Sequence, residues 1–342
     1  IGNEIKDIDD KIRIADFANE RNVFSHFASK SRFLKNDSFI FDIEVNESMA
    51  GIFDKVKNGS SKIKDLFDVC RGINPYDKYT GQSEEVIKNK AYHADYKKDE
   101  TFVPLLQGKH IGRFSHNWDE KTYISYGDWL AAPREAKYFT GERIVFREIL
   151  GKTLISTILT EDIKIDRSLY IALPKNESVN IYYVDGILNS VLMSTYFRYS
   201  NNEFDDLFPK MRVAEFRELP IKLADEQTQN SIAELVKKML NLNADVQKKC
   251  AKFLSRVRDN LGAAKITSAL QEFYALDFAG FVKELGKQKI KLSLKEQDEW
   301  QEYFDDYKAD IAALTEQIEA TDKAINAAVY ALYGLSAERR WL

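Results

Sequence analysis

Two short segments contain residue types that could act on a phosphate group or a metal ion. Gly151-Lys152-Thr153 has the ending of a phosphate-binding loop, but such a loop needs a glycine five residues earlier, where this chain has Phe146. Asp162 and Lys164 form half of a metal-dependent nuclease motif, but no convincing Pro-Asp partner precedes them. Because both motifs are incomplete, we expect neither a nucleotide-binding loop nor a nuclease centre.

A third segment is similar to part of a methyl-transfer site. Asn74-Pro75-Tyr76 lacks the second proline of the Asn/Asp-Pro-Pro-Tyr loop with which amino-methyltransferases hold a target base. The chain also lacks the glycine-rich turn that follows the first strand of a cofactor-binding Rossmann fold. The four histidines have no recognisable nucleophile or carboxylate companion, and the two cysteines form no CxxC pair. We therefore expect no catalytic residue, no metal ion and no cofactor in this chain.

The composition is that of a globular protein without an overall bias towards nucleic acid. Hydrophobic residues make up 44% and charged residues 30% of the 342 residues, and no apolar run approaches the roughly 20 residues that span a bilayer. The formal net charge is −4, so any contact with nucleic acid must come from a local patch. Because the chain starts with Ile1 and a polar sequence, we expect a part of a longer cytoplasmic protein without a secretory signal.

The first part of the chain carries apolar residues at helical spacing. Ile12, Ile14 and Phe17 begin this pattern, and Ile52 belongs to its continuation after an aromatic stretch. The sequence therefore predicts an N-terminal helical linker segment over residues 1–60.

Short strand-like runs follow, rich in β-branched and aromatic residues and bounded by Gly, Pro, Asn or Asp. These runs lie at residues 122–126, 143–146, 154–159, 168–173 and 179–184. All six prolines fall in the same part of the chain, and one helix is expected at residues 186–199. Residues 61–223 are therefore predicted to form a β-rich domain, and the whole chain an α+β fold.

Helical periodicity returns beyond the last proline. An apolar stripe starts at residues 232–242, and a second long helix is expected from Leu294 to Tyr333. Ser293 is the expected N-cap of that helix, and Gly334 the expected stop. With a shorter helical segment between the two, residues 224–342 are predicted to form an antiparallel helical hairpin.

The loops of the β-rich region carry side chains that suit DNA. Arginine can form paired hydrogen bonds with guanine, Asn and Gln with adenine, and lysine binds phosphate. The candidates for base reading are Asn74, Tyr76, Lys78, Arg113, Arg147 and Arg167, those for phosphate contact are Lys109, Lys152, Lys164 and Lys210, and further DNA-binding candidates are Arg71, Gln107 and Arg143. Because acidic residues roughly cancel the basic ones here, composition leaves open whether these loops bind DNA or are ordinary solvated loops.

The order of several segments over most of the chain is similar to that of a known family. The segments are residues 66–73, 104–114, 129–134, 143–148, 208–212 and 218–221, and in the helical part 233–243, 320–326 and 329–335. They resemble the TaqI-like C-terminal specificity domain of type IIG restriction–modification enzymes and related adenine-N6 DNA methyltransferases. The chain departs from the family at His110, where Asp is frequent, and at Asn326, where we expect Asp.

The resemblance implies sequence-specific recognition of double-stranded DNA without catalysis. In this family, loops enter the major groove and helices set the spacing, and the bacterial parent carries a methyltransferase domain, in fused enzymes also a nuclease. S-adenosylmethionine and Mg²⁺ would then belong to the parent, and its methyltransferase domain would be a partner. Three alternatives are half of a type I restriction specificity subunit, a protein-interaction scaffold, and an enzyme in its own right.

Overall fold

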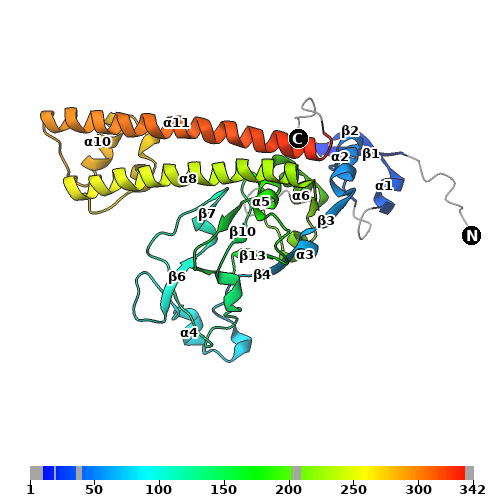
Figure 1. Ribbon diagram of the computed structural model, residues 1–342, viewed down its shortest axis with the longest axis horizontal. Coiled ribbons are helices and arrows are strands. Elements are labelled where there is room, and N and C mark those ends of the chain that lie inside the picture. Colours follow the sequence, from blue (N-terminus) through cyan, green and yellow to red (C-terminus); the bar gives the residue numbers. More distant parts are fainter. Residues whose placement is uncertain (1–10, 19–20, 36–40, 202, 204–208, 336–342) are drawn as a thin grey trace, which may run out of the picture. The chain divides into compact units, whose positions relative to one another are not determined.

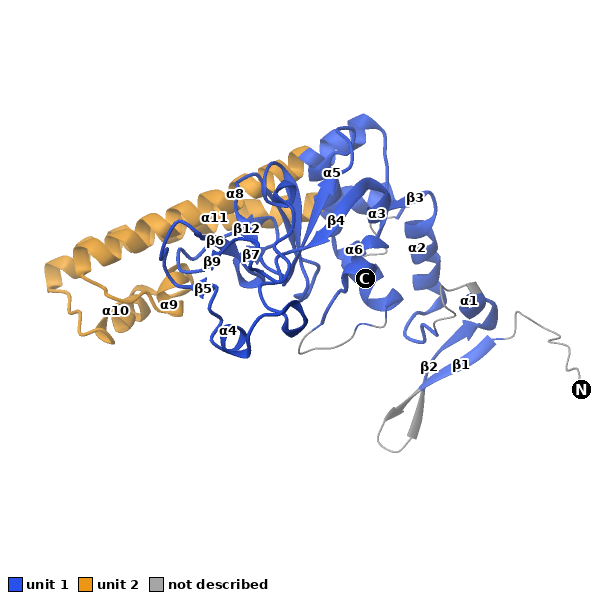
Figure 2. Cartoon of the chain, turned by 90° about the horizontal axis from the view of Figure 1, so that it is seen from below, with its two compact units in different colours: residues 1–233, 326–342 blue, residues 234–325 orange. Residues whose placement is uncertain are grey.

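A computed structural model describes residues 11–18, 21–35, 41–201, 203 and 209–335. The chain divides into two compact units (Figure 2). Unit 1 comprises residues 1–233 and 326–342, and unit 2 comprises residues 234–325. Both unit boundaries lie inside long helices rather than at residue 224. The expected mixture of α and β structure is confirmed.

The start of unit 1 differs from the predicted helical linker. Strands β1 (Lys11–Ala18) and β2 (Arg21–Ser29) form an antiparallel hairpin. Ile12 and Ile14 are half-buried while their neighbours are exposed, and this alternation has the period of a strand, not of a helix. The helical prediction is therefore wrong for these residues.

The described remainder of this segment contains helices, as expected. It contains α1 (Lys30–Lys35) and α2 (Glu47–Lys57). Helix α2 begins after Asn46, whose side chain accepts a hydrogen bond from the backbone of Met49. It buries one apolar stripe, so this part of the prediction is confirmed.

Among the described residues, the β-rich region contains two four-stranded sheets (Figure 1). The first has the order β11-β10-β13-β4, the second β12-β6-β9-β5. The strands of the first sheet are β4 (Phe67–Arg71), β10 (Arg143–Arg147), β11 (Ser156–Leu159) and β13 (Leu169–Pro174), and those of the second are β5 (His93–Ala94), β6 (Phe102–Leu106), β9 (Tyr123–Ser125) and β12 (Lys164–Ile165). The pair β12–β6 is parallel and the other pairs are antiparallel. Buried side chains from both sheets form one core.

Most of the strand predicted at residues 179–184 is instead the start of a helix. Helix α5 (Ile181–Leu188) begins after Asn180, whose side chain accepts a hydrogen bond from the backbone of Tyr183 at 3.1 Å. Because almost every side chain of α5 is buried, its apolar run shows no helical period and reads like a buried strand. The single helix expected at residues 186–199 is therefore two helices. The second, α6 (Val191–Ser200), begins after its own N-cap, Ser190.

Shorter elements complete unit 1. They are β3 (Ser60–Lys62), α3 (Ile63–Leu66), α4 (Glu84–Lys88), β7 (Ile111–Gly112), β8 (Ser115–His116), α7 (Val213–Arg217) and β14 (Pro220–Lys222), together with 3-10 turns at Lys78–Thr80, Gly108–His110 and Ala136–Phe139.

Unit 2 contains most of the two long helices α8 (Glu226–Leu261) and α11 (Leu294–Leu332), which lie side by side within it (Figures 1 and 2). Lys249 on α8 pairs with Asp310 on α11 at 2.5 Å, and Phe253 stacks on Tyr303 with ring centroids 5.6 Å apart. A later residue of α8 thus meets an earlier residue of α11, which confirms the antiparallel hairpin.

The ends of these helices carry the predicted signals. Ser293 and Glu296 exchange hydrogen bonds at the start of α11. Gly334 has a φ of +66° just after its end. Helices α9 (Ser268–Gln271) and α10 (Phe278–Gly286) lie in the connection and pack on an aromatic core. Within the described part of the chain, no helix is long and apolar enough to cross a membrane.

Candidate nucleic-acid interface

Three of the predicted arginines lie at one end of the sheet β11-β10-β13-β4, with Arg71 and Arg147 on opposite faces of it by register. Arg71 ends β4 and pairs in register with Tyr170, and Arg147 ends β10 and pairs with Leu169. Arg167 lies two residues before the start of β13. Because both strand ends flank the first residues of β13, we call Arg71, Arg147 and Arg167 the arginine rim.

Backbone hydrogen bonds fix the loops that carry the rim. The N–H groups of Gly72 and Ile73 donate to the carbonyls of Leu169 and Ile165 at 2.9 and 2.8 Å. The N–H of Asp166 donates to the carbonyl of Leu106 at 2.9 Å. At Gly72 two backbone segments approach so closely that a Cβ atom on residue 72 would lie 2.2 Å from the Asp166 carbonyl oxygen. The loops after β4, β6 and β12 therefore hold one another in place.

Ser168 adds a side-chain link between these loops. Its hydroxyl accepts a hydrogen bond from the N–H of Gly108 at 2.8 Å and donates a short one to Asp166. The sequence reasoning missed both Ser168 and Asp166 as positioning residues. The available signal was the Asp-x-Ser spacing, because Asp and Ser side chains in turns commonly bond to nearby backbone groups.

Two of the rim arginines already have partners within the protein. Arg71 donates two hydrogen bonds to Glu148, the shorter at 2.7 Å, and another to the carbonyl of Arg167 at 2.7 Å. The guanidinium of Arg167 donates to the side-chain oxygen of Asn74 at 3.2 Å. Arg167 is otherwise exposed. Glu148 was not anticipated from the sequence, since its pairing with Arg71 depends on the sheet register.

Arg147 differs from its two neighbours on the rim. Its side chain is half-buried, yet it makes no hydrogen bond or ion pair with any residue that the structure describes. Burial lowers the pKa of its guanidinium. It lies beside Gly108, where a Cβ atom would be 3.6 Å from Arg147 Cγ. The guanidinium is thus partly desolvated, and no described residue uses its donors.

Arg143 is wrong as a DNA contact. Its side chain is 0% exposed. It donates to the backbone carbonyls of Gly141 and Glu161 at 2.6 and 2.7 Å. Burial lowers the pKa of this guanidinium, and Glu161 and Asp162 partly offset the effect. Arg143 therefore fastens loops to the core.

Two other base-reading candidates make internal contacts. Arg113 is half-buried and donates to the carbonyl of Asn189 at 2.8 Å. The hydroxyl of Tyr76 accepts a hydrogen bond from the N–H of Tyr92 at 2.9 Å and lies 2.9 Å from His93 Nδ1. DNA would have to compete with these contacts.

Lys109 and Gln107 lie beside a buried histidine. Lys109 is exposed and pairs with Asp119 at 2.7 Å. Gln107 is half-buried, and its N–H donates to His110 Nδ1 at 3.0 Å. Burial raises the pKa of Asp119, but hydrogen bonds, first from Lys109 and His110, outweigh this and hold it well below its usual range. These bonds stabilise the turn after β6.

The remaining lysine candidates fall into two groups. Lys78, Lys152 and Lys210 are exposed, and Lys78 lies 4.8 Å from the ring centroid of Tyr79. Lys164 is half-buried between two aromatic rings, 4.1 Å from the ring centroid of Tyr126 and 4.6 Å from that of Phe139. Burial lowers the pKa of Lys164. The lysines of the first group are accessible to phosphate. Lys164 would lose its contacts with the two rings if it bound a phosphate instead.

Residues 103–221 match the TaqI-like C-terminal specificity domain. The resemblance expected from the sequence is confirmed over this range. Arg147 and Arg167 of the rim lie inside the matched range, and Arg71 precedes it. Residues 225–329 match a second family, described as a domain of unknown function (DUF8810). No curated protein matches the chain.

Two solved structures are similar to the chain. The type IIL restriction-modification enzyme MmeI in complex with DNA is 10% identical with a TM-score of 0.36, over 81% of this chain and 34% of that chain. The S subunit of a type I restriction-modification system from M. genitalium is 14% identical with a TM-score of 0.31, over 64% of this chain and 50% of that chain. The chain therefore spans about a third and a half of the length of these two proteins.

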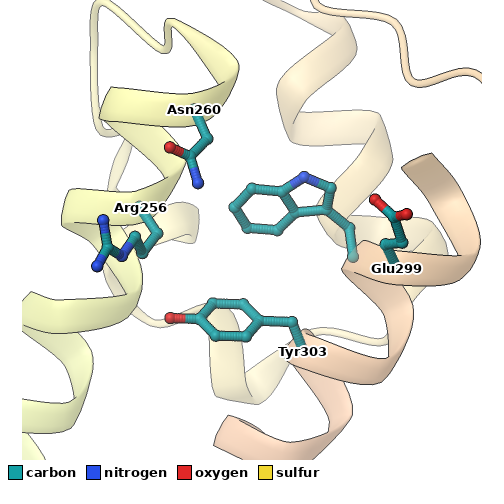
Figure 3. A pocket seen from close by; sticks show the side chains of 5 residues that line it. Arg256, Asn260, Glu299 and Tyr303 are labelled. Carbon is teal, nitrogen blue, oxygen red and sulfur yellow. The ribbon is translucent and has the colours of Figure 1, made fainter.

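A pocket of about 260 Å³ lies within unit 2, outside the specificity domain (Figure 3). Arg256 and Asn260 line it from α8, and Glu299, Trp300 and Tyr303 line it from α11. Over the described ranges, no group of His, Cys, Asp or Glu side chains could hold a metal ion.

Proposed function

We propose that this chain recognises a specific sequence of double-stranded DNA as the target-recognition part of a restriction–modification system. The match of residues 103–221 to a specificity domain supports the assignment of this class. The positions of Arg147 and Arg167 support its location, because both place a guanidinium at the same end of one sheet.

The observation that carries the proposal is Arg147. A partly desolvated guanidinium costs free energy unless it gains a hydrogen-bonding partner. The O6 and N7 atoms of guanine accept two hydrogen bonds from such a fork in the major groove. Because backbone hydrogen bonds fix the strand and the loops around Arg147 before binding, the backbone that carries this side chain loses little further freedom when a base arrives.

Different residues are expected to supply orientation and specificity. Arg147 and Arg167 would read base edges, while the exposed Lys152 and Lys210 would bind phosphates and set the register on the duplex. Lys210 belongs to a backbone bridge with Ile149, so it is attached to the loop that follows Arg147.

The chain would not itself catalyse a reaction. Under this proposal, the chemistry belongs to a bacterial, cytoplasmic parent whose methyltransferase domain uses S-adenosylmethionine, with Mg²⁺ where a nuclease is also present. That parent domain would be the protein partner of this chain.

The direct test is selection of the 342-residue chain against a library of randomised duplexes at low salt. Enrichment of one short motif is expected. Absence of binding even at low salt would contradict the proposal and favour a protein-interaction scaffold.

A pair of variants tests the assignment of roles. Arg147→Ala is expected to weaken binding of the selected motif by about 1–3 kcal/mol and to relax one position of it. Lys152→Ala should weaken all duplexes alike and reduce the slope of log K against log salt by about 1. Arg258→Ala is the matched control, because that side chain is exposed on α8 and belongs to unit 2, whereas the rim belongs to unit 1. Identical, sequence-independent losses for Arg147→Ala and Lys152→Ala would refute this division.

A further inference from the structure

The connection between α8 and α11 in unit 2 holds two segments side by side. The side-chain oxygen of Gln288 accepts a hydrogen bond from the N–H of Lys265 at 3.0 Å, and its amide nitrogen donates to the carbonyl of Lys265 at 2.7 Å. This two-way bond fastens the segment after α8 to the segment after α10. Lys265 therefore lies next to the lysine-rich residues 287–291.

Packing sorts these residues into an inner and an outer set. Ile290 and Leu292 pack against the aromatic core of unit 2. Lys289 and Lys291, which alternate with them, are exposed, as is Lys283 on the preceding helix α10. We call Lys265, Lys283, Lys289 and Lys291 the tip lysines.

The tip lysines form no direct ion pairs within the described residues, although Lys283 lies within electrostatic range of Glu284. None of the four side chains forms a hydrogen bond or an ion pair with a residue that the structure describes. The one glutamate in residues 283–291, Glu284, pairs with Lys287 instead. This stretch thus contains four lysines and one glutamate, in a chain whose net charge is −4.

The backbone contributes to this display of charge. Lys289 has a φ of +63°, in the left-handed region that glycine adopts more readily. The alternation of side chains on either side of it depends on this turn. A concentration of unpaired positive charge on a fixed, exposed surface is the usual footprint of a polyanion site.

We propose that the tip lysines bind phosphate groups of duplex DNA, independently of its sequence. The inference rests on the proposed function, since a chain that holds a duplex through its specificity domain raises the local concentration of phosphates for a second, tethered site. Each lysine that neutralises a phosphate releases a condensed counterion, so this contact contributes affinity that salt removes. The tip lysines read no base, and the arginine rim alone carries specificity.

The test measures binding of the full chain to a duplex without the selected motif over a series of salt concentrations. In the triple variant Lys283→Gln, Lys289→Gln and Lys291→Gln, the slope of log K against log salt is expected to decrease by about 2–3, at about 0.9 per phosphate contact. The matched control replaces Lys238, Lys252 and Lys323 with Gln. These three are also exposed in unit 2 but lie on the long helices. The slope of the control variant should stay close to that of the unsubstituted chain.

Two outcomes separate this inference from the proposed function. Equal slopes for the tip variant and the control would overturn the role of the tip lysines while leaving motif enrichment in the library selection intact. If the unsubstituted chain enriched no motif, while its salt slope still depended on the tip lysines, the proposed function would be overturned instead. Equal urea-unfolding midpoints for the two triple variants would show that folding is not the cause of any difference.

Discussion

Asp185 is predicted to make the stability of unit 1 depend on pH. This carboxyl is fully buried, and its Oδ1 accepts hydrogen bonds from the hydroxyl of Ser156 at 2.5 Å and from the amide of Asn189 at 3.1 Å. Burial raises its pKa from 3.8 to about 7, although the bond from Ser156 and the charge of Arg113 act in the opposite direction. The folded protein therefore keeps a proton that the unfolded chain loses.

The sign and size of the effect follow from this difference in pKa. Below pH 3.8 the carboxyl is protonated in both states, so the stabilisation is complete. Between pH 3.8 and about 7 the unfolded state binds fewer protons, and the free energy of unfolding decreases as the pH rises. At about 1.4 kcal/mol per pH unit, the loss is on the order of 4 kcal/mol in total.

The variant Asp185→Asn keeps an oxygen acceptor but cannot ionise. Its free energy of unfolding can be measured by urea titration at a series of pH values. It should not show the decrease that the unsubstituted chain shows as the pH rises to about 7. Asp225→Asn is the control: hydrogen bonds from Thr228 hold the pKa of this exposed carboxyl below its usual value, so the control should retain the decrease. If the unsubstituted chain instead gained stability relative to Asp185→Asn as the pH rose, Asp185 would be ionised in the folded protein. The reasoning would then be wrong.

Three further substitutions test other structural assignments. Arg143→Met should lower the free energy of unfolding by about 1–3 kcal/mol for each backbone carbonyl left without a donor, and a change in the selected DNA motif would contradict its internal role. Gly72→Ala should cost about 3 kcal/mol or more, because the new methyl group would overlap the Asp166 carbonyl, and an unchanged melting temperature would argue against that close approach. Lys164→Gln should cost about 1–2 kcal/mol of cation–π stabilisation in urea titrations, whereas a loss of DNA affinity with unchanged stability would assign this lysine to phosphate binding.

Local signals were sufficient to predict the long helices of the hairpin. Ser293 and Glu296 mark the start of α11 and Gly334 its end, since capping depends on residues within one turn. The same reasoning failed where burial hides the period. Helix α5 is buried on nearly all sides and resembles a strand, and the alternation of Ile12 and Ile14 was too short to outweigh the apolar residues around it.

The candidate interface was predictable in residue types but not in arrangement. The sequence contains Arg143 and Arg147 on one strand, four residues apart. It does not show that one is enclosed by backbone carbonyls while the other ends the strand with unused donors. The arginine rim depends on the pairing of β10 and β4 with β13, in which Arg147 and Arg71 pair with residues 22 and 99 positions away, and no local pattern encodes that register.

The way in which the rim loops are held has an evolutionary consequence. Their positions depend on backbone groups of Gly72, Ile73 and Asp166 and on the Ser168 hydroxyl, not on the side chains of Arg147 or Arg167. Replacing either of those two side chains by another would therefore leave the backbone positions of the loops unchanged. A lineage could acquire a new target site by point substitution at the rim without first having to rescue folding.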